Sequence, residues 1–156
     1  MSVSVSPFWR YWAPPILWAL ALLALSGEAG SSRHTSNFLQ WVLSWIVTPS
    51  PEVLDLLHNL LRQAVHVFAY GILSVFWFRA LAFRFPGSPG ANFLFALLLS
   101  LAVALLDEGH QALVPSREGS LGDVALDMAG AALLTAFAAY ARRLSLSPPE
   151  ARPPSP

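Results

Sequence analysis

Carboxylates gather in one stretch of the chain, between the end of one very apolar run and the start of the next. Five of the nine acidic residues fall within the 21 positions from Asp107 to Asp127. Charged side chains at the mouth of apolar helices cost free energy, so they usually serve a function. Neighbouring carboxylates cannot all carry charge cheaply, and two carboxyl groups of different acidity are what general acid–base chemistry requires. This stretch is therefore the first candidate for a functional centre.

Further polar side chains occur at helical spacing around it. Arg62, His66 and Tyr70 follow one another in steps of four and share one helix face. The candidate catalytic residues are Asp107, Glu108 and His66, and the candidate binding residues are Gln111, Arg117, Asp123, Asp127, Arg62 and Tyr70. Because a carboxylate base and an imidazole proton carrier occur together, one hypothesis is an intramembrane hydrolase or transferase with Asp107 or Glu108 as its base.

Two non-enzymatic interpretations use the same residues. Arg117 and Arg62 carry guanidinium groups that hold phosphate or carboxylate, so the site would bind a polar head group. Asp127 lies inside an apolar run and would be the titrating group of a small proton-coupled carrier. A purely structural interpretation also stays open, with Asp123 in the first turn of a helix, Asp127 hydrogen-bonded to a neighbouring helix, and His66 as a packing residue of the interior.

Metal and cofactor chemistry finds little support in the residue pattern. His66, Asp107, Glu108 and His110 offer suitable ligand atoms, but their spacing matches no strong ligand motif. The chain contains no phosphate-binding glycine loop, nucleophile elbow or HExxH motif. We therefore predict neither a metal nor a cofactor.

The composition indicates a membrane protein. Hydrophobic residues make up 55% of the 156 positions and charged residues only 12%, about half the share of a soluble domain. A net charge of zero gives no sign of a nucleic-acid partner. The absence of cysteine excludes disulfides and thiol catalysis.

The apolar runs predict an all-α fold with four transmembrane helices and one or two interfacial or amphipathic helices between the first and second spans. The spans are expected over 9–26, 65–85, 91–106 and 121–141, with an interfacial helix over 37–48 and an amphipathic helix from 51 that runs into the second span. A cleaved signal peptide is the alternative for the first run.

Local signals refine these elements. Ser50 and Pro51 are expected as the N-cap and first position of the amphipathic helix, and Pro14-Pro15 in the first turns of the first span. In the last span, two pairs of alanines four apart predict small faces where another helix approaches closely: Ala125 with Ala129, and Ala132 with Ala136.

Arginine placement predicts the orientation. If the N-terminus is cytoplasmic, six arginines lie at the inner ends of the spans and three at the outer ends. Both termini are then cytoplasmic and the acidic stretch lies on the outer face. The domain division is a membrane domain over 9–143 and a proline-rich, disordered cytoplasmic tail over 144–156.

The motif Asp107-Glu108-x-x-Gln111, followed by Pro115-x-Arg117, Asp123 and a small-residue run with Gly130, resembles the VanZ-like family of small membrane proteins. Arg62-x-x-x-His66-x-x-x-Tyr70 and Leu25-Ser26 are similar to two further family patterns. The chain departs from that pattern by carrying Asp127 for asparagine, Gln63 for lysine and Val67 for phenylalanine, which makes the site more negative.

The resemblance implies a four-span protein of the bacterial cytoplasmic membrane. One founding member of the family is linked to resistance to teicoplanin, which acts on cell-wall precursors outside the membrane. The resemblance and the residues together predict that the partner is a membrane lipid or a lipid-linked envelope precursor, bound or modulated at the outer face.

Overall fold

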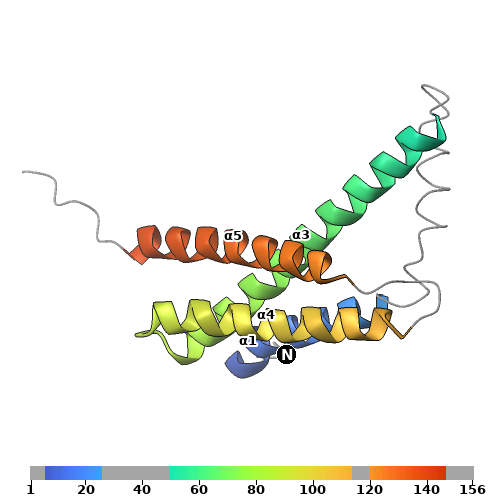
Figure 1. Ribbon diagram of the computed structural model, residues 1–156. Helices are drawn as coiled ribbons and strands as arrows, with labels where there is room; N and C mark the ends of the chain where they lie inside the picture. The colour runs from blue at the N-terminus through green and yellow to red at the C-terminus, as the bar shows by residue number, and fades with distance from the viewer. Residues whose placement is uncertain (1–5, 26–49, 114–119, 147–156) are drawn as a thin grey trace, which may run out of the picture.

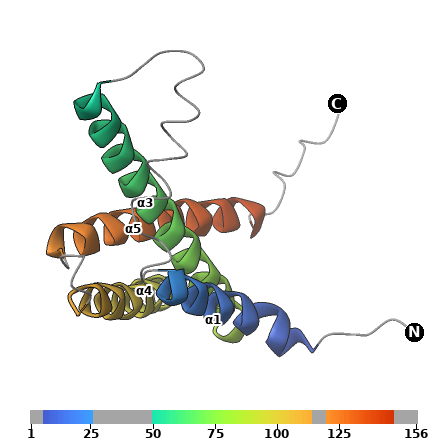
Figure 2. The same cartoon turned by 90° about the vertical axis from the view of Figure 1, so that its right-hand side faces the viewer.

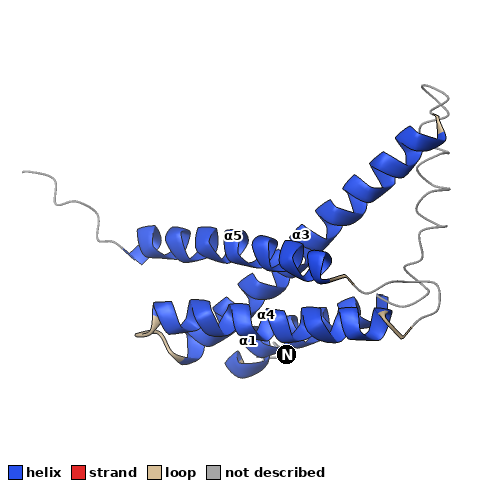
Figure 3. Cartoon of the chain, viewed as in Figure 1, coloured by secondary structure: helices blue, strands red, loops and turns tan. Residues whose placement is uncertain are grey.

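The computed structural model describes residues 6–25, 50–113 and 120–146, and almost all of them are helical. The helices are α1 (Pro7–Leu25), α3 (Pro51–Arg84), α4 (Pro89–Gln111) and α5 (Leu121–Leu146). Figure 3 shows no strand in these ranges. All four helices are long and apolar enough to cross a membrane. The predicted all-α membrane fold with four spans is confirmed, whereas the expected interfacial helix over 37–48 and most of the tail over 144–156 lie outside the described ranges.

Helix α1 packs into the bundle. Its Ala19 belongs to the buried core, and the indole Nε1 of Trp18 donates a hydrogen bond of 2.9 Å to the carbonyl oxygen of Ala69. These contacts favour a membrane span over a cleaved signal peptide. Because the helix begins at Pro7, Pro14 and Pro15 lie about two turns inside it instead of in the first turns as expected. Membrane helices tolerate interior prolines when neighbouring groups satisfy the freed backbone atoms.

Helix α3 combines the predicted amphipathic segment and the second span in one element. Its 34 residues are about 51 Å long at 1.5 Å per residue, which exceeds the roughly 30 Å of a hydrocarbon layer. Ser50 and Pro51 occupy the predicted N-cap and first helical positions, although the Ser50 side chain makes no capping hydrogen bond. Figures 1 and 2 show that the beginning of α3 extends beyond the other helices.

Helices α3 and α5 cross in close contact at Gly130. A Cβ atom added to Gly130 would overlap the carbonyl oxygen of Val67 and lie 2.8 Å from its Cα. On α3, a Cβ added to Gly71 would lie 2.8 Å from the Leu134 side chain. Glycine is therefore required for the two backbones to touch, and this contact sets how α5 is rotated against α3.

The alanine faces predicted for close approach are not the packing face of α5. Ala125, Ala129 and Ala136 are exposed, and Ala132 is only partly buried. The inward face instead carries Asp127, Gly130, Ala131 and Thr135. Alanine costs little in contact with lipid, whereas a carboxylate there is expensive, so burying Asp127 favours the same rotation of α5 as the contact at Gly130.

The interior of the bundle contains several buried polar side chains. Between α3 and α5, the Thr135 hydroxyl donates to Ser74 Oγ at 2.7 Å, and both side chains are fully buried. The buried face of α4 combines small and polar residues, namely Asn92, Ala96, Ser100, Ala104, Asp107, Glu108 and Gln111. This face leads from the start of α4 to the acidic stretch at its end.

Candidate functional site

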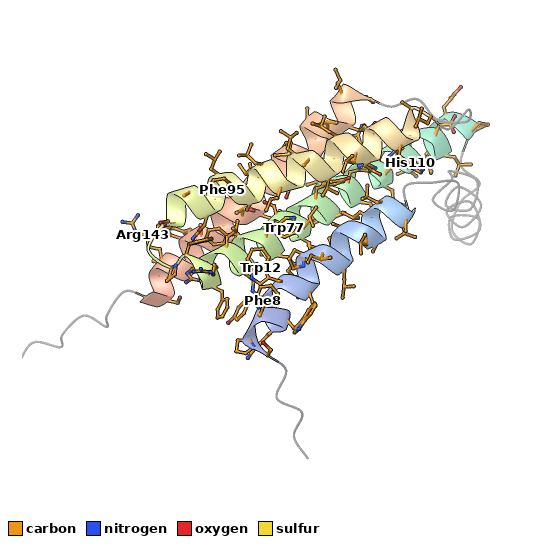
Figure 4. All side chains as sticks on the ribbon, turned by 90° about the horizontal axis from the view of Figure 1, so that it is seen from below. Phe8, Trp12, Trp77, Phe95, His110 and Arg143 are labelled. Carbon is orange, nitrogen blue, oxygen red and sulfur yellow. The ribbon has the colours of Figure 1, made fainter. Side chains whose placement is uncertain are left out.

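Three helices bring polar side chains together at one end of the bundle. We call this set the polar cluster; it comprises Arg62, His66 and Tyr70 of α3, Asp107, Glu108 and Gln111 of α4, and Asp123 and Asp127 of α5. Figure 4 marks this end of α4 by His110, while Phe8 and Arg143 mark the opposite end of the bundle.

Within the polar cluster, two side-chain pairs join α3 to α5, one helical turn apart. Arg62 Nη1 lies 3.1 Å from Asp123 Oδ2, and this ion pair is partly exposed. One turn further along α3, His66 Nδ1 lies 3.0 Å from Asp127 Oδ1. Asp127 is fully buried, and it lies one turn before Gly130 on α5, while His66 directly precedes Val67 on α3. The tight crossing at Gly130 therefore brings these two side chains within hydrogen-bonding distance.

A second network joins α3 to α4. The Tyr70 hydroxyl donates to Asp107 Oδ2 at 3.0 Å, and Gln111 Nε2 donates to the same oxygen at 3.2 Å. All three side chains are buried. The rings of Tyr70 and His66 lie nearly parallel, with centroids 6.3 Å apart, so the two networks are neighbours. The two hydrogen bonds from Tyr70 and Gln111 hold the Asp107 carboxylate in one orientation.

Glu108 is held by the backbone at the beginning of α5. The amide N–H of Ser120 donates to Glu108 Oε2 at 2.6 Å, which is a short, charge-assisted type of hydrogen bond. Ser120 Oγ in turn accepts a hydrogen bond of 3.1 Å from the amide of Gly122, as an N-cap residue does. The start of α5 and the end of α4 are thus joined through one carboxylate.

Three carboxylates of the polar cluster keep an open acceptor. Asp107 Oδ1, Glu108 Oε1 and Asp127 Oδ2 are buried and have no hydrogen-bond partner in the described part of the chain. In each case the other oxygen of the same group is bonded. Leaving a buried acceptor unpaired costs about 1–3 kcal/mol, and more for a charged group. The cluster is thus arranged to receive hydrogen-bond donors.

Charge is unevenly balanced in the cluster. Four carboxylates are accompanied by one guanidinium and one imidazole, and the guanidinium of Arg62 is already bonded to Asp123. Within the described ranges, no group of three or more His, Asp or Glu side chains has the geometry of a metal site. The arrangement therefore suits a ligand that carries a cationic or hydroxyl donor better than it suits an anionic ligand.

The structure places eight of the nine predicted site residues in one cluster, and the ninth, Arg117, lies outside the described residues. It pairs His66 with Asp127, whereas the enzyme hypothesis had placed His66 beside Asp107 or Glu108. Ser120 was not among the predicted residues. Its place directly before an apolar helix is the sequence signal of an N-cap and would have identified it.

These features define a class: a four-helix membrane protein with a buried, acidic polar cluster at one end. Comparison with family models then identifies the relatives. The VanZ/LLP1 model matches residues 12–142, most of the chain, and the protein belongs to this family. A comparison with curated proteins and another with solved structures returned no match.

Proposed function

We propose that this protein binds a lipid or a lipid-linked component of the bacterial cell envelope, with the polar cluster as its binding site. The observation that carries the proposal is the set of three open carboxylate oxygens, on Asp107, Glu108 and Asp127, inside helices that can span a membrane. A network that only held the helices together would leave fewer such atoms unpaired, because each one costs stability.

Membership of the VanZ/LLP1 family agrees with a role in the cell envelope. The resemblance described above links this type of protein to teicoplanin resistance, and teicoplanin acts outside the membrane. We therefore propose that ligand binding takes place at the outer leaflet and lowers susceptibility to glycopeptides. Arg62 bonds Asp123, so its expected role as a head-group ligand requires that this exposed pair opens.

The proposal includes an orientation in the bacterial cytoplasmic membrane, with both termini cytoplasmic. Arg79 and Arg84 near the end of α3, and Arg142 and Arg143 near the end of α5, supply the positive charge expected at the inner surface. Tags at the two termini should be protected from added protease in intact cells. A protease-accessible C-terminus would move the polar cluster to the inner face and refute this part of the proposal.

Unbiased lipid identification tests the binding function. The full chain is extracted in native membrane patches, and its lipids are compared with those of the bulk membrane by mass spectrometry. We expect one lipid class to be enriched with the wild type, and the enrichment to fall in the Asp107→Asn variant. The control Glu52→Gln changes an exposed carboxylate at the start of α3 and should have no effect. A lipid profile equal to the bulk membrane would contradict the proposal.

One observation favours an enzyme as the second candidate. His66 is bonded to a buried carboxylate at 3.0 Å, and a carboxylate in this position orients an imidazole for proton transfer. The purified protein would be incubated with a lipid phosphate donor and assayed for hydrolysis or transfer. Turnover that disappears in Asp127→Asn would support this candidate. Lipid binding without turnover would contradict the enzyme and support the binding function.

A further inference from the structure

A groove opens beside Glu108, one of the four carboxylates of the polar cluster. It has a volume of about 240 Å³ and lies between the end of α4 and the start of α5. Its lining is Glu108 together with Leu105, Gly109, Ala112, Ser120 and Leu121. We call it the Glu108 groove. Its volume is several times the roughly 30 Å³ occupied by one water molecule, so it has room for a head-group fragment.

The walls of the groove are suited to a membrane amphiphile. Leu105 and Leu121 are exposed leucines of two helices that can span a membrane. A Cβ added to Gly109 would meet no atom within 4 Å, so this side of the groove is open. Apolar walls around a single carboxylate match a molecule with one polar group and a hydrocarbon part.

Glu108 is built into the groove as an acceptor. Only 6% of the residue is exposed, and the Ser120 amide holds Oε2 in place. The other oxygen, Oε1, is buried and has no partner in the described ranges. A carboxylate with one oxygen fixed and the other unpaired accepts a donor with little loss of conformational freedom.

The charge of the surroundings selects among donors. Asp107, Asp123 and Asp127 accompany Glu108 in the polar cluster, and the one guanidinium described there is engaged with Asp123. A hydroxyl group would supply a donor and leave the excess negative charge unchanged. A primary ammonium group supplies three donors and a positive charge, and charge-assisted hydrogen bonds are roughly twice as strong as neutral ones.

We propose that the Glu108 groove binds the primary ammonium head group of a membrane amphiphile, with Glu108 Oε1 accepting an N–H hydrogen bond. This inference rests on the proposed lipid-binding function and names the chemical class of the ligand. The expectation from the sequence was a head group held by arginines through its phosphate or carboxylate. The groove adds a carboxylate subsite, and a zwitterionic lipid carries both kinds of group.

The test uses the full chain in vesicles of defined composition. Phosphatidylethanolamine, phosphatidylcholine and phosphatidylglycerol with identical acyl chains are mixed in equal amounts, and the lipids retained after mild detergent extraction are quantified. Phosphatidylcholine is the decisive comparison because methylation removes all three N–H donors and keeps the charge. We expect the wild type to retain phosphatidylethanolamine about tenfold over phosphatidylcholine, the size of effect expected for one charge-assisted hydrogen bond.

Two variants and two matched controls locate the effect. Glu108→Gln removes the charge, and Gly109→Leu adds a bulky side chain to a residue of the groove lining while keeping Glu108. Both variants should retain phosphatidylethanolamine and phosphatidylcholine in about equal amounts. Gly109→Leu keeps the proposal testable if Glu108→Gln fails to fold. Gly90→Leu places the same side chain in open space at the other end of α4, and Glu52→Gln changes an exposed carboxylate. Both controls should retain the wild-type preference.

The outcomes separate this inference from the proposed function. Equal retention of the ethanolamine and choline lipids, or a preference that survives both groove variants, overturns the ammonium site. Selective retention of the glycerol lipid overturns it as well but supports lipid binding by the protein. Retention of no lipid above its share, here and in native membrane patches, overturns the inference and the proposed function together.

Discussion

At one end of the bundle the helices meet through charged and hydroxyl-bearing side chains, and at the other end they meet through aromatic rings. In the polar cluster, His66 bonds Asp127 at 3.0 Å. At the opposite end, which we call the aromatic end, Tyr11 stacks on Phe83 with ring centroids 4.2 Å apart, and Trp12 meets Trp77 at 6.3 Å. Figure 4 shows Trp12 and Trp77 lying close together between α1 and α3.

The two ends differ in the atoms they leave unpaired. At the aromatic end these are the indole Nε1 donors of Trp12 and Trp77, which are neutral. In the polar cluster they are carboxylate oxygens, for which burial without a partner costs more than for a neutral group. Ring packing closes the aromatic end by dispersion and apolar burial. The polar cluster therefore carries the stronger requirement for an external partner.

The largest expected effect comes from separating α3 and α5 at the polar cluster. Gly130→Leu places a side chain where the Val67 backbone lies. We expect a loss of about 3 kcal/mol or more in the free energy of unfolding, because neither backbone can give way. Unfolding in detergent, followed by circular dichroism, measures it. Gly90→Leu, in open space, is the control; equal stability of the two variants would disprove the close crossing.

The next effect is the coupling between His66 and Asp127. In a double-mutant cycle with His66→Ala and Asp127→Ala, we expect a coupling energy of about 1.5 kcal/mol, in the upper range of hydrogen bonds between membrane helices, since the bond to a fully buried group is lost in either single variant. The same unfolding assay supplies the four stabilities. Additive losses would mean that the two side chains do not interact in the folded protein.

Tyr70→Phe removes one hydroxyl and keeps the ring. Because this hydroxyl donates to buried Asp107 at 3.0 Å, we expect the stability to fall by about 1 kcal/mol, within the range of hydrogen bonds between membrane helices. Tyr140→Phe is the matched control, since Tyr140 is 62% exposed. A loss of the same size in the control would remove the argument for a specific bond to Asp107.

The smallest effect is expected at the aromatic end. The stacked pair Tyr11 and Phe83 should show a coupling energy of about 0.5–1 kcal/mol in a cycle of alanine variants, as is typical of aromatic pairs. Combining Tyr11→Ala with Phe95→Ala should be additive, since Phe95 points away from the bundle in Figure 4. A coupling energy between Tyr11 and Phe83 larger than that between His66 and Asp127 would contradict the expectation that the polar cluster holds the stronger interaction.

Much of the fold followed from local signals. Apolar runs of spanning length predicted four membrane helices, and the absence of a breaker after Pro51 predicted that the amphipathic segment and the second span form one helix. Steps of four placed Arg62, His66 and Tyr70 on one face of that helix. Helical spacing determines these neighbours because it depends only on the backbone of a single element.

The contacts between helices could be predicted less well from the sequence than the helices themselves. The alanine pairs of α5 predicted the wrong packing face, since alanine is tolerated both in lipid and between helices. Only the crossing at Gly130 determines that Asp127 faces His66, and only the return of the chain from α4 to α5 brings the Ser120 amide to Glu108.

The sequence by itself thus determined that this is a four-span membrane protein with acidic residues at one end, because hydrophobicity and helical spacing are properties of contiguous residues. The tertiary structure decided which carboxylate is bonded to which partner and which oxygens stay open. Those facts depend on how each helix is rotated about its own axis against the next, and this rotation is set by packing between residues that are far apart in the chain.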